Sequence, residues 1–286
     1  MKRRRFIELS MASLAGCSKS QRKDVVAVKA GLFVVNVPVK WSKNAIIEKV
    51  PIKPLYSKED WMTYQDNELR ELKPAYICRP QHWAIRFPDA LPSGIYFDRA
   101  NTGDNPTAPQ ILIYKADEWS VAFTDGKHEK MKSADVLRSL RESMDGAMVH
   151  DDPRLSPAYM DASLAFMCLK RRIDFSGGHG IRLVAQWTIE PNLMRLGDLH
   201  YLFLGMSDDN SCQIIATFPL SLPGLPGSGV MSHLGRDTQN YVEFSKGYEG
   251  YTKDAKKWLE QHADEITPSI HSLDVMMQSL VARRWE

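Results

Sequence analysis

The sequence predicts an α+β domain built on an antiparallel sheet, a meander, with helices on one face of the sheet and two helices at the C-terminus. Residues 181–189 alternate between apolar and mostly polar side chains, which is typical of a strand with one buried face. Residues 248–280 place apolar side chains three or four positions apart, as amphipathic helices do. The chain has 286 residues, 43% of them hydrophobic, which is enough to form a sizeable core.

Three strands are expected before the centre of the chain. Residues 32–37 are apolar and β-branched, residues 83–87 alternate in polarity, and residues 110–114 are again apolar. A helix is expected to begin at Ser133, whose hydroxyl can cap free backbone amides, and to end at Gly146, which can adopt the left-handed conformation. These elements precede the meander.

The meander is expected between residues 165 and 219. Its strands are residues 173–175, 181–189, 199–204 and 213–218. Two turns connect them, one at residues 176–180, where adjacent glycines permit positive φ angles, and a polar one at residues 207–210. Residues 219–235 then form a loop rich in Pro, Gly and Ser.

Each C-terminal helix is predicted by an apolar stripe. The first stripe consists of Tyr248, Tyr251, Ala255, Trp258 and Leu259. The second helix begins at Thr267 and has Pro268 in its first turn, where the missing amide hydrogen of proline would have no partner. Its stripe consists of Ile270, Leu273, Met277 and Leu280.

The first seventeen residues carry an export pattern. A basic cluster at residues 2–5 precedes a short, weakly apolar stretch that ends in Leu-Ala-Gly-Cys at residues 14–17. This ending resembles the lipobox of bacterial lipoproteins. The resemblance implies cleavage before Cys17, a diacylglyceryl group on its thiol and an acyl chain, such as palmitate, on its new amino terminus. A plainer interpretation is a basic cytoplasmic N-terminus followed by a buried cysteine.

The basic cluster also resembles a twin-arginine export signal, because Arg3 and Arg4 are followed by Phe6 at the expected spacing. Lys2 and Glu8 differ from the usual flanks of that signal. Glu8 also makes the apolar stretch a poor one, which favours the twin-arginine route over the general one. The export route stays open between the two.

The export pattern divides the chain into three parts. Residues 1–16 are expected to be a signal peptide, residues 17–30 a lipid-anchored tether, and residues 31–286 a single α+β domain. Each buried methylene of an acyl chain contributes about 0.8 kcal/mol, so several chains hold a protein durably at a membrane. Ser18 stands where an aspartate would resemble an inner-membrane retention signal. The expected location is therefore the periplasmic face of the outer membrane.

Charge and hydropathy exclude two classes of protein. The chain has 37 basic and 35 acidic residues, and removing residues 1–16 leaves a net charge of −1. This balance argues against a nucleic-acid binder driven by overall charge, so no nucleic acid is expected as a partner. No apolar run approaches the roughly 20 residues that a membrane-spanning helix needs, which excludes an integral transporter or channel.

Three cysteines remain after Cys17, namely Cys78, Cys168 and Cys212. One disulfide with one buried thiol, or three buried thiols, are both compatible with this number. None of them forms a Cys-x-x-Cys pair or stands at metal-ligand spacing with a histidine. No metal and no cofactor are therefore predicted.

Two polar turns of the meander are candidate sites. Asp208, Asp209 and Asn210 offer oxygen ligands for a hard cation such as calcium, but a hairpin turn whose side chains bond their own backbone is favoured. His179, which stands among glycines, is a candidate base in a flexible loop, but a turn is again favoured. Neither turn therefore predicts a catalytic residue.

Two further candidate sites, a serine and a pair of aspartates, also predict no catalytic residue. Ser228 in Gly-Ser-Gly does not form the Gly-x-Ser-x-Gly elbow of serine hydrolases. Asp151 and Asp152 offer carboxylates for acid–base work, but their place before a proline favours a turn.

The aromatic stripe of the first C-terminal helix, Tyr248, Tyr251 and Trp258, suits stacking on a sugar. Core packing is favoured, because the same spacing is needed for a buried helix face. No catalytic residue is predicted in this stripe either.

Several segments resemble a family of uncharacterised secreted or lipid-anchored bacterial proteins. They are residues 109–114 (PQILIY), 180–182 (GIR), 201–205 (YLFLG), 218–226 (FPLSLPGLP), 267–268 (TP), 273–274 (LD) and 279–280 (SL). The likeness runs in order from about residue 82 to residue 280, and it implies a common fold. It implies no activity.

The sequence thus predicts a bacterial envelope lipoprotein, more a binding or assembly protein than an enzyme. Its expected partners are the membrane, through the lipid, and an envelope protein or peptidoglycan. Two alternatives stay open. One is a periplasmic hydrolase acting on an envelope polymer, and the other is a periplasmic immunity or inhibitor lipoprotein that places residues 219–235 in the cleft of an incoming toxin.

Overall fold

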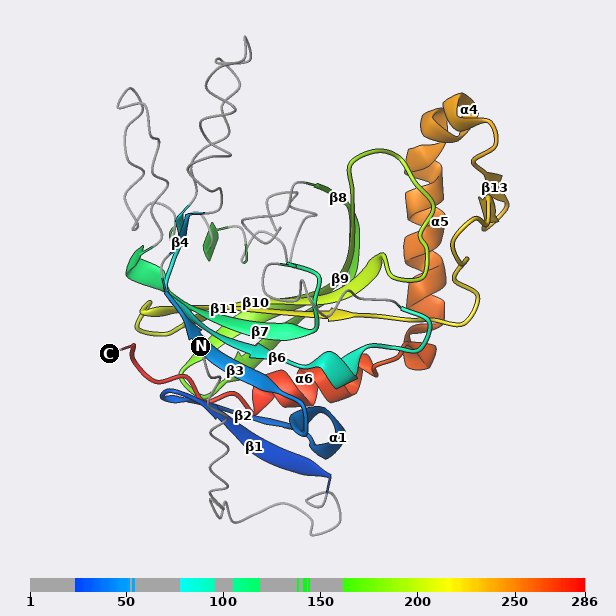
Figure 1. The fold of residues 1–286 in the computed structure, drawn as a ribbon. Helices are drawn as coiled ribbons and strands as arrows, with labels where there is room; N and C mark the ends of the chain where they lie inside the picture. The colour runs from blue at the N-terminus through cyan, green and yellow to red at the C-terminus, as the bar shows by residue number, and fades with distance from the viewer. Residues whose placement is uncertain are drawn as a thin grey trace, which may run out of the picture.

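Figure 1 shows the fold in a computed structural model, which describes residues 24–51, 53–54, 78–95, 105–118 and 162–285 together with residues 138, 141, 142 and 144. The strands are β1 (Val25–Ala30), β2 (Phe33–Pro38), β3 (Ile46–Val50), β4 (Lys53–Pro54), β5 (Cys78–Arg79), β6 (His82–Arg86), β7 (Gln110–Lys115), β8 (Ser163–Phe175), β9 (Gly178–Thr188), β10 (Leu199–Ser207), β11 (Cys212–Pro219), β12 (Ser232–His233) and β13 (Arg236–Asp237). The α-helices are α1 (Val39–Ser42), α4 (Tyr241–Lys246), α5 (Tyr248–Gln261) and α6 (Ile270–Gln278).

A large antiparallel sheet organises the molecule. Within the described residues it has seven strands in the order β3-β6-β7-β11-β10-β9-β8, and every neighbouring pair is antiparallel. The strands β8 to β11 are neighbours in chain order, as a meander requires, and β11 then pairs with β7 rather than continuing outward. The predicted α+β class with an antiparallel sheet and C-terminal helices is confirmed.

Both faces of the sheet are buried. One face carries Val184 and Tyr201 in a core cluster that also contains residues of β1, β2, α5 and α6. The opposite face carries Leu183 and Leu202 in a second cluster, into which Met144 packs. The prediction that all helices lie on one face is not confirmed.

The expectation of one polar face on β9 is wrong. Arg182 and Gln186, which were expected to face solvent, are only 7% and 1% exposed. Each has a buried partner: Arg182 pairs with Asp274, and the amide of Gln186 donates to the backbone carbonyl of Leu193 at 3.5 Å. Polar side chains with such partners can be buried. The strand also ends at Thr188.

The N-terminal hairpin starts earlier than expected. β1 lies inside residues 17–30, the range predicted as tether, and pairs antiparallel with β2 in a separate two-stranded sheet. Val28 and Ala30 of β1 join the first core cluster. This burial makes the segment part of the fold, and the hairpin lies at the bottom of the view in Figure 1, near α6.

Residues after α6 join distant parts of the chain. The amide of Val281 donates to the Val34 carbonyl at 2.8 Å, and the amide of Ala282 donates to the Ser176 carbonyl at 2.9 Å. Gly177, with φ +88°, stands in this contact, and a Cβ there would lie 2.4 Å from the Ala282 carbonyl oxygen. The C-terminal segment thus ties the β1–β2 hairpin to the turn between β8 and β9.

None of the helices in the described part of the chain has the length and apolar character that crossing a bilayer requires.

Candidate functional site

The residues predicted for export and lipidation, Arg3, Arg4, Phe6 and Cys17, lie outside the described residues. The pair Asp151 and Asp152 lies outside them as well. These predictions therefore stay predictions.

Two of the three remaining cysteines have side chains in the described part of the chain, and Cys212 is a free thiol. Cys168 and Cys212 are both buried, and burial raises the pKa of the Cys212 thiol. A thiol with a raised pKa is a poor nucleophile at neutral pH. The backbone of Cys78 lies in β5, whereas its side chain is outside the description.

The acidic turn between β10 and β11 uses its own side chains. One carboxylate oxygen of Asp209 accepts hydrogen bonds from the Ser207 hydroxyl at 2.7 Å and from the Ser211 amide at 3.0 Å. Asn210 has a φ of +63°, the left-handed conformation that asparagine tolerates. The hairpin interpretation is confirmed. Among the described residues, no three His, Cys, Asp or Glu side chains are grouped to hold a metal ion.

The structure brings His179 close to Asp208 but does not gather the other sequence candidates into one site. His179 is the second residue of β9, where its ring faces Asp208 at 3.7 Å, rather than part of the preceding turn. Ser228 is exposed in the loop between β11 and β12. Tyr251 is fully buried, and Tyr248 and Trp258 pack against the same core cluster. Core packing therefore accounts for the aromatic stripe.

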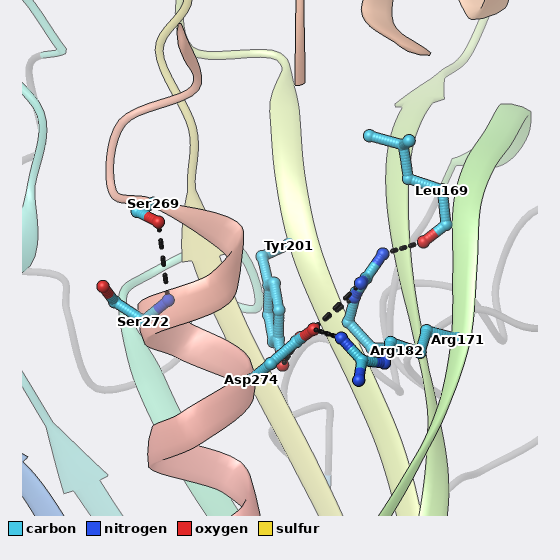
Figure 2. Close-up of polar contacts among 7 residues, drawn as sticks. All are labelled: Leu169, Arg171, Arg182, Tyr201, Ser269, Ser272 and Asp274. Carbon is cyan, nitrogen blue, oxygen red and sulfur yellow. Dashed lines mark hydrogen bonds and ion pairs between the residues drawn. The ribbon is translucent and has the colours of Figure 1, made fainter. Parts of the chain in front are cut away.

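A buried ion pair joins α6 to the sheet, as Figure 2 shows. The Arg182 guanidinium of β9 donates to both carboxylate oxygens of Asp274, with Nε–Oδ1 3.0 Å and Nη2–Oδ2 2.9 Å. The Tyr201 hydroxyl donates to Oδ1 at 3.2 Å, and Arg171 approaches Oδ2 at 3.5 Å. The side chains of Arg182 and Asp274 are 8% and 2% exposed.

Local structure puts these groups in register. The β8–β9 pairing shifts between Cys168 and Arg171, and Leu169 there has a φ of +50°. The bulge presents the Leu169 carbonyl, which accepts a hydrogen bond from Arg182 Nη1. At the other end, Ser269 caps α6 by accepting the Ser272 amide. Such a cap fixes the start of the helix that carries Asp274.

This arrangement stabilises the fold and has the wrong properties for catalysis. Burial and the neighbouring Asp274 carboxylate raise the pKa of the Tyr201 hydroxyl well above its usual value. The hydroxyl therefore stays protonated and continues to donate. Because the carboxylate is occupied by Arg182 and Tyr201 and is closed to solvent, a substrate has no access to it. Its role is to hold α6 against β9 and β10.

Two ionisable groups with opposite pKa shifts lie at the start of β10. Burial raises the pKa of Asp198 to about 6, partly offset by the Arg195 amide, which donates to its carboxylate at 3.2 Å. Burial lowers the pKa of His200 to about 4. The Nδ1 of His200 lies 2.9 Å from the Asp198 carbonyl oxygen. Because a carbonyl only accepts, Nδ1 carries the proton of the neutral ring.

The surface feature that stands out is apolar. Among the described residues, five of the eight large apolar side chains that are exposed come from the segments around α4 and from the end of β9. We call these five residues the apolar end: Ile189 (87% exposed), Val230 (43%), Met231 (41%), Tyr241 (43%) and Val242 (63%).

Hydrogen bonds bring the segments of the apolar end together. The Tyr241 hydroxyl donates to the Glu190 carboxylate at 3.4 Å, which places the start of α4 beside the end of β9. The Thr238 amide donates to the Met231 carbonyl at 2.8 Å, across the short hairpin of β12 and β13. In Figure 1, α4 lies beyond one end of α5 and β13 lies beside α5, both away from the sheet.

Only part of this surface was predictable from the sequence. Residues 219–235 were predicted to be an exposed loop, and residues 228–232 at its tip are exposed. Ile189 was assigned to the buried face of β9, and that assignment is wrong, because the strand ends one residue before it. The exposure of Tyr241 and Val242 was not predicted. A Tyr-Val pair at the start of a short helix was the available signal.

No protein-family model, no curated protein and no solved structure matches the chain.

Proposed function

We propose that the protein is a lipid-anchored protein of the bacterial cell envelope that binds another protein and is not an enzyme. The basic cluster, the short apolar stretch and the Leu-Ala-Gly-Cys ending at Cys17 support the anchor. The resemblance to secreted and lipid-anchored bacterial proteins, which runs from about residue 82 to residue 280, also supports it. The expected location is the periplasmic face of the outer membrane.

The observation that carries the binding function is the apolar end. Exposed apolar side chains occur singly on most protein surfaces, but a group drawn from separate segments marks an interaction site. Ile189, Met231 and Val242 come from three different segments of the chain, and each is exposed. Hydrogen bonds from Tyr241 to Glu190 and from Thr238 to Met231 bring these segments close to one another. The best-formed polar cluster in the described residues, around Asp274, is closed to substrates. Binding therefore fits these residues better than catalysis does.

We also propose which face of the sheet the C-terminal helices cover. The helices α5 and α6 are proposed to cover the sheet face that carries Val184 and Tyr201. Leu259 of α5 and Leu273 of α6, which belong to the same core cluster, support this placement.

Metabolic labelling with palmitate tests the anchor. Wild-type protein should incorporate the label, and Cys17→Ala should incorporate none, because the acylated cysteine is gone. Cys212→Ala is the matched control, since it removes a cysteine that is buried and free, and it should keep the label. Continued labelling of Cys17→Ala would refute lipidation at that residue.

The export route has its own test. Replacing Arg3 and Arg4 together with Lys keeps the positive charge but removes the arginine pair. Export of the mature protein should stop if the twin-arginine route is used. Unchanged export of this variant would assign the protein to the general route.

One observation favours the immunity or inhibitor alternative as a second candidate. The tip of the loop between β11 and β12 exposes Val230 and Met231 next to small residues, and residues 219–235 include no charged side chain. A loop of this kind suits insertion into the cleft of another protein. A gene for an envelope toxin should then lie beside this one, and the variant with Val230→Glu and Met231→Glu should no longer protect cells from that toxin.

A further inference from the structure

We infer that the apolar end binds in an uncharged, apolar recess of a folded partner protein. The apolar end lies on the side of this molecule that faces away from the anchoring membrane. This inference rests on the proposed function, whose anchor it uses to orient the molecule.

The chemistry of the apolar end defines what can bind it. Its centre consists of aliphatic side chains, a thioether and one tyrosine ring, and the adjoining loop at residues 219–235 carries no charge. A charged partner surface would lose its hydration here without gaining an opposite charge. An apolar recess loses only unfavourable hydration, which is the main driving force of protein association. The complementary surface is therefore uncharged and apolar.

The rim around this centre is polar and carries both signs of charge. The acidic residues Glu190 and Glu243 are exposed, and so are the basic residues Arg236 and Lys246. An apolar centre with a polar rim is the usual construction of a protein–protein interface. A surface that lies on an anionic membrane is instead rich in lysine and arginine, without a balancing acidic set. The rim thus favours a protein over a lipid surface.

The position of the tether also favours a protein over a lipid surface as the partner. Six residues lie between the lipid-bearing Cys17 and Asp24, and the seven steps along the chain span at most about 24 Å when fully extended. They lead into β1, which lies at the bottom of Figure 1, whereas α4 and β13 lie at the top right, on the other side of the sheet. The short tether therefore holds the β1 side against the membrane, and the apolar end faces the opposite way.

The shape of the apolar end indicates which of the two proteins carries the recess. The helix α4 stands clear of the sheet beyond one end of α5, and β13 lies beside α5 (Figure 1). The ring of His233 in β12 packs against Trp258 of α5. Val230 and Met231 lie in the exposed tip of the loop that leads into β12. Projecting apolar side chains enter a recess in another molecule. The recess is accordingly expected on the partner.

Photocross-linking in living cells tests this assignment. The full-length lipidated protein would carry a benzophenone amino acid at Val230, Val242 or Val275 in turn. Val275 is the matched control, because it is a valine on a helix, α6, and is 48% exposed, but lies outside the apolar end. The expected result is one and the same protein, other than this chain, cross-linked from positions 230 and 242 and absent from position 275.

Binding of the purified partner completes the test. The cross-linked protein would be identified by mass spectrometry, purified, and titrated against the soluble domain. Val242→Glu should weaken the affinity at least tenfold, because it places a charge in an apolar recess, whereas Val275→Glu should stay within twofold of wild type. Unchanged melting temperatures of both variants would show that they remain folded.

Every other pattern contradicts the inference. Adducts between two copies of this chain would assign the apolar end to self-association, and adducts with lipid or glycan would assign it to the membrane or the wall polymer. Equal adducts from all three positions, or none from positions 230 and 242, would also overturn it. Palmitate labelling of the same cells separates the two proposals, because the label on Cys17 tests the anchor whatever the cross-links show.

Discussion

At α6 the chain buries charge, whereas at the apolar end it exposes apolar side chains. Asp274 and Arg182 are nearly closed to water, yet every strong interaction they need is supplied by each other, Tyr201 and the Leu169 carbonyl. Ile189 and Val242, in contrast, are mostly in solvent, and each keeps its unfavourable hydration in the free molecule. The first region is complete within this chain, and the second is proposed to be completed by a partner.

These two regions show how a structural cluster can be distinguished from a binding surface. A buried polar cluster attracts attention as an active site, but its satisfied hydrogen bonds and lack of access indicate a role in folding. Exposed apolar side chains contribute little to folding, so their grouping needs another explanation. Substitutions at α6 should therefore change stability, and substitutions at the apolar end should change binding.

The largest effect is expected at Asp274. Replacing it with Ala leaves the Arg182 guanidinium buried without its carboxylate, which should cost about 3–5 kcal/mol of unfolding free energy. Urea unfolding would measure it. The double variant Asp274→Leu with Arg182→Met removes both charges and should recover much of that loss. A loss below about 1 kcal/mol in the single variant would show that the pair does not hold α6.

The next largest effect is a pH dependence of stability, which arises from two ionisable groups at the start of β10. The pKa of His200 is lowered to about 4, so the unfolded chain takes up a proton first and stability falls as pH drops from 6.5 through 4. The pKa of Asp198 is raised to about 6, so its contribution is complete below 3.8 and is lost as pH rises through 6. The two dependences oppose each other in the wild type.

Two variants separate these opposed contributions. Asp198→Asn should gain on the order of 2 kcal/mol at pH 7, because it removes a buried charge, and the gain should vanish by pH 4. His200→Gln keeps a donor to the Asp198 carbonyl and should lose the acid destabilisation, worth on the order of 3 kcal/mol by pH 4. Urea unfolding at several pH values measures both. Differences from wild type that do not change with pH would contradict this explanation.

A smaller effect is expected at the cap of α6. Ser269→Ala removes the hydroxyl that accepts the Ser272 amide, and such a loss typically costs about 1 kcal/mol. Ser269→Thr keeps the acceptor and is the control. Thermal unfolding of the three proteins gives the answer, and equal stability of the Ala variant would show that the cap is not used in solution.

The smallest change in stability is expected at Val242. Val242→Ser should alter the unfolding free energy by less than about 0.5 kcal/mol, because the side chain is 63% exposed. The same unfolding experiment used for Asp274 provides the measurement. A loss above about 1 kcal/mol would mean that Val242 helps to hold α4 in place, and the contrast between the two regions would weaken.

Sequence patterns predicted the sheet better than its surroundings. The alternation over residues 181–189 and the glycines before it were enough to locate β9 and its hairpin, because these signals are local. The burial of Arg182 was missed because its partner, Asp274, lies 92 residues away. Nothing near β9 in the sequence distinguishes an arginine that meets a buried carboxylate from one that meets water.

The candidate site was harder to predict for a related reason. The loop predicted at residues 219–235, of which residues 228–232 are exposed, was recognisable from its Pro, Gly and Ser content. The exposure of Ile189 and Val242 depends on where a strand ends and on which side of α4 faces the core, and both are decided by tertiary packing. The pattern at Cys17 is the opposite case, since it is complete in the sequence and lies outside the described residues.

We propose that a lipid on Cys17 holds the β1 side at the membrane while the apolar end faces away and binds a protein. Fluorescence quenching in vesicles tests it most directly. The lipidated protein would carry a fluorescent amino acid at Lys29, an exposed residue of β1, or at Val242, in vesicles that contain nitroxide-labelled lipid. Quenching is expected at position 29 and not at position 242. Equal or stronger quenching at position 242 would place the apolar end on the membrane and contradict the account.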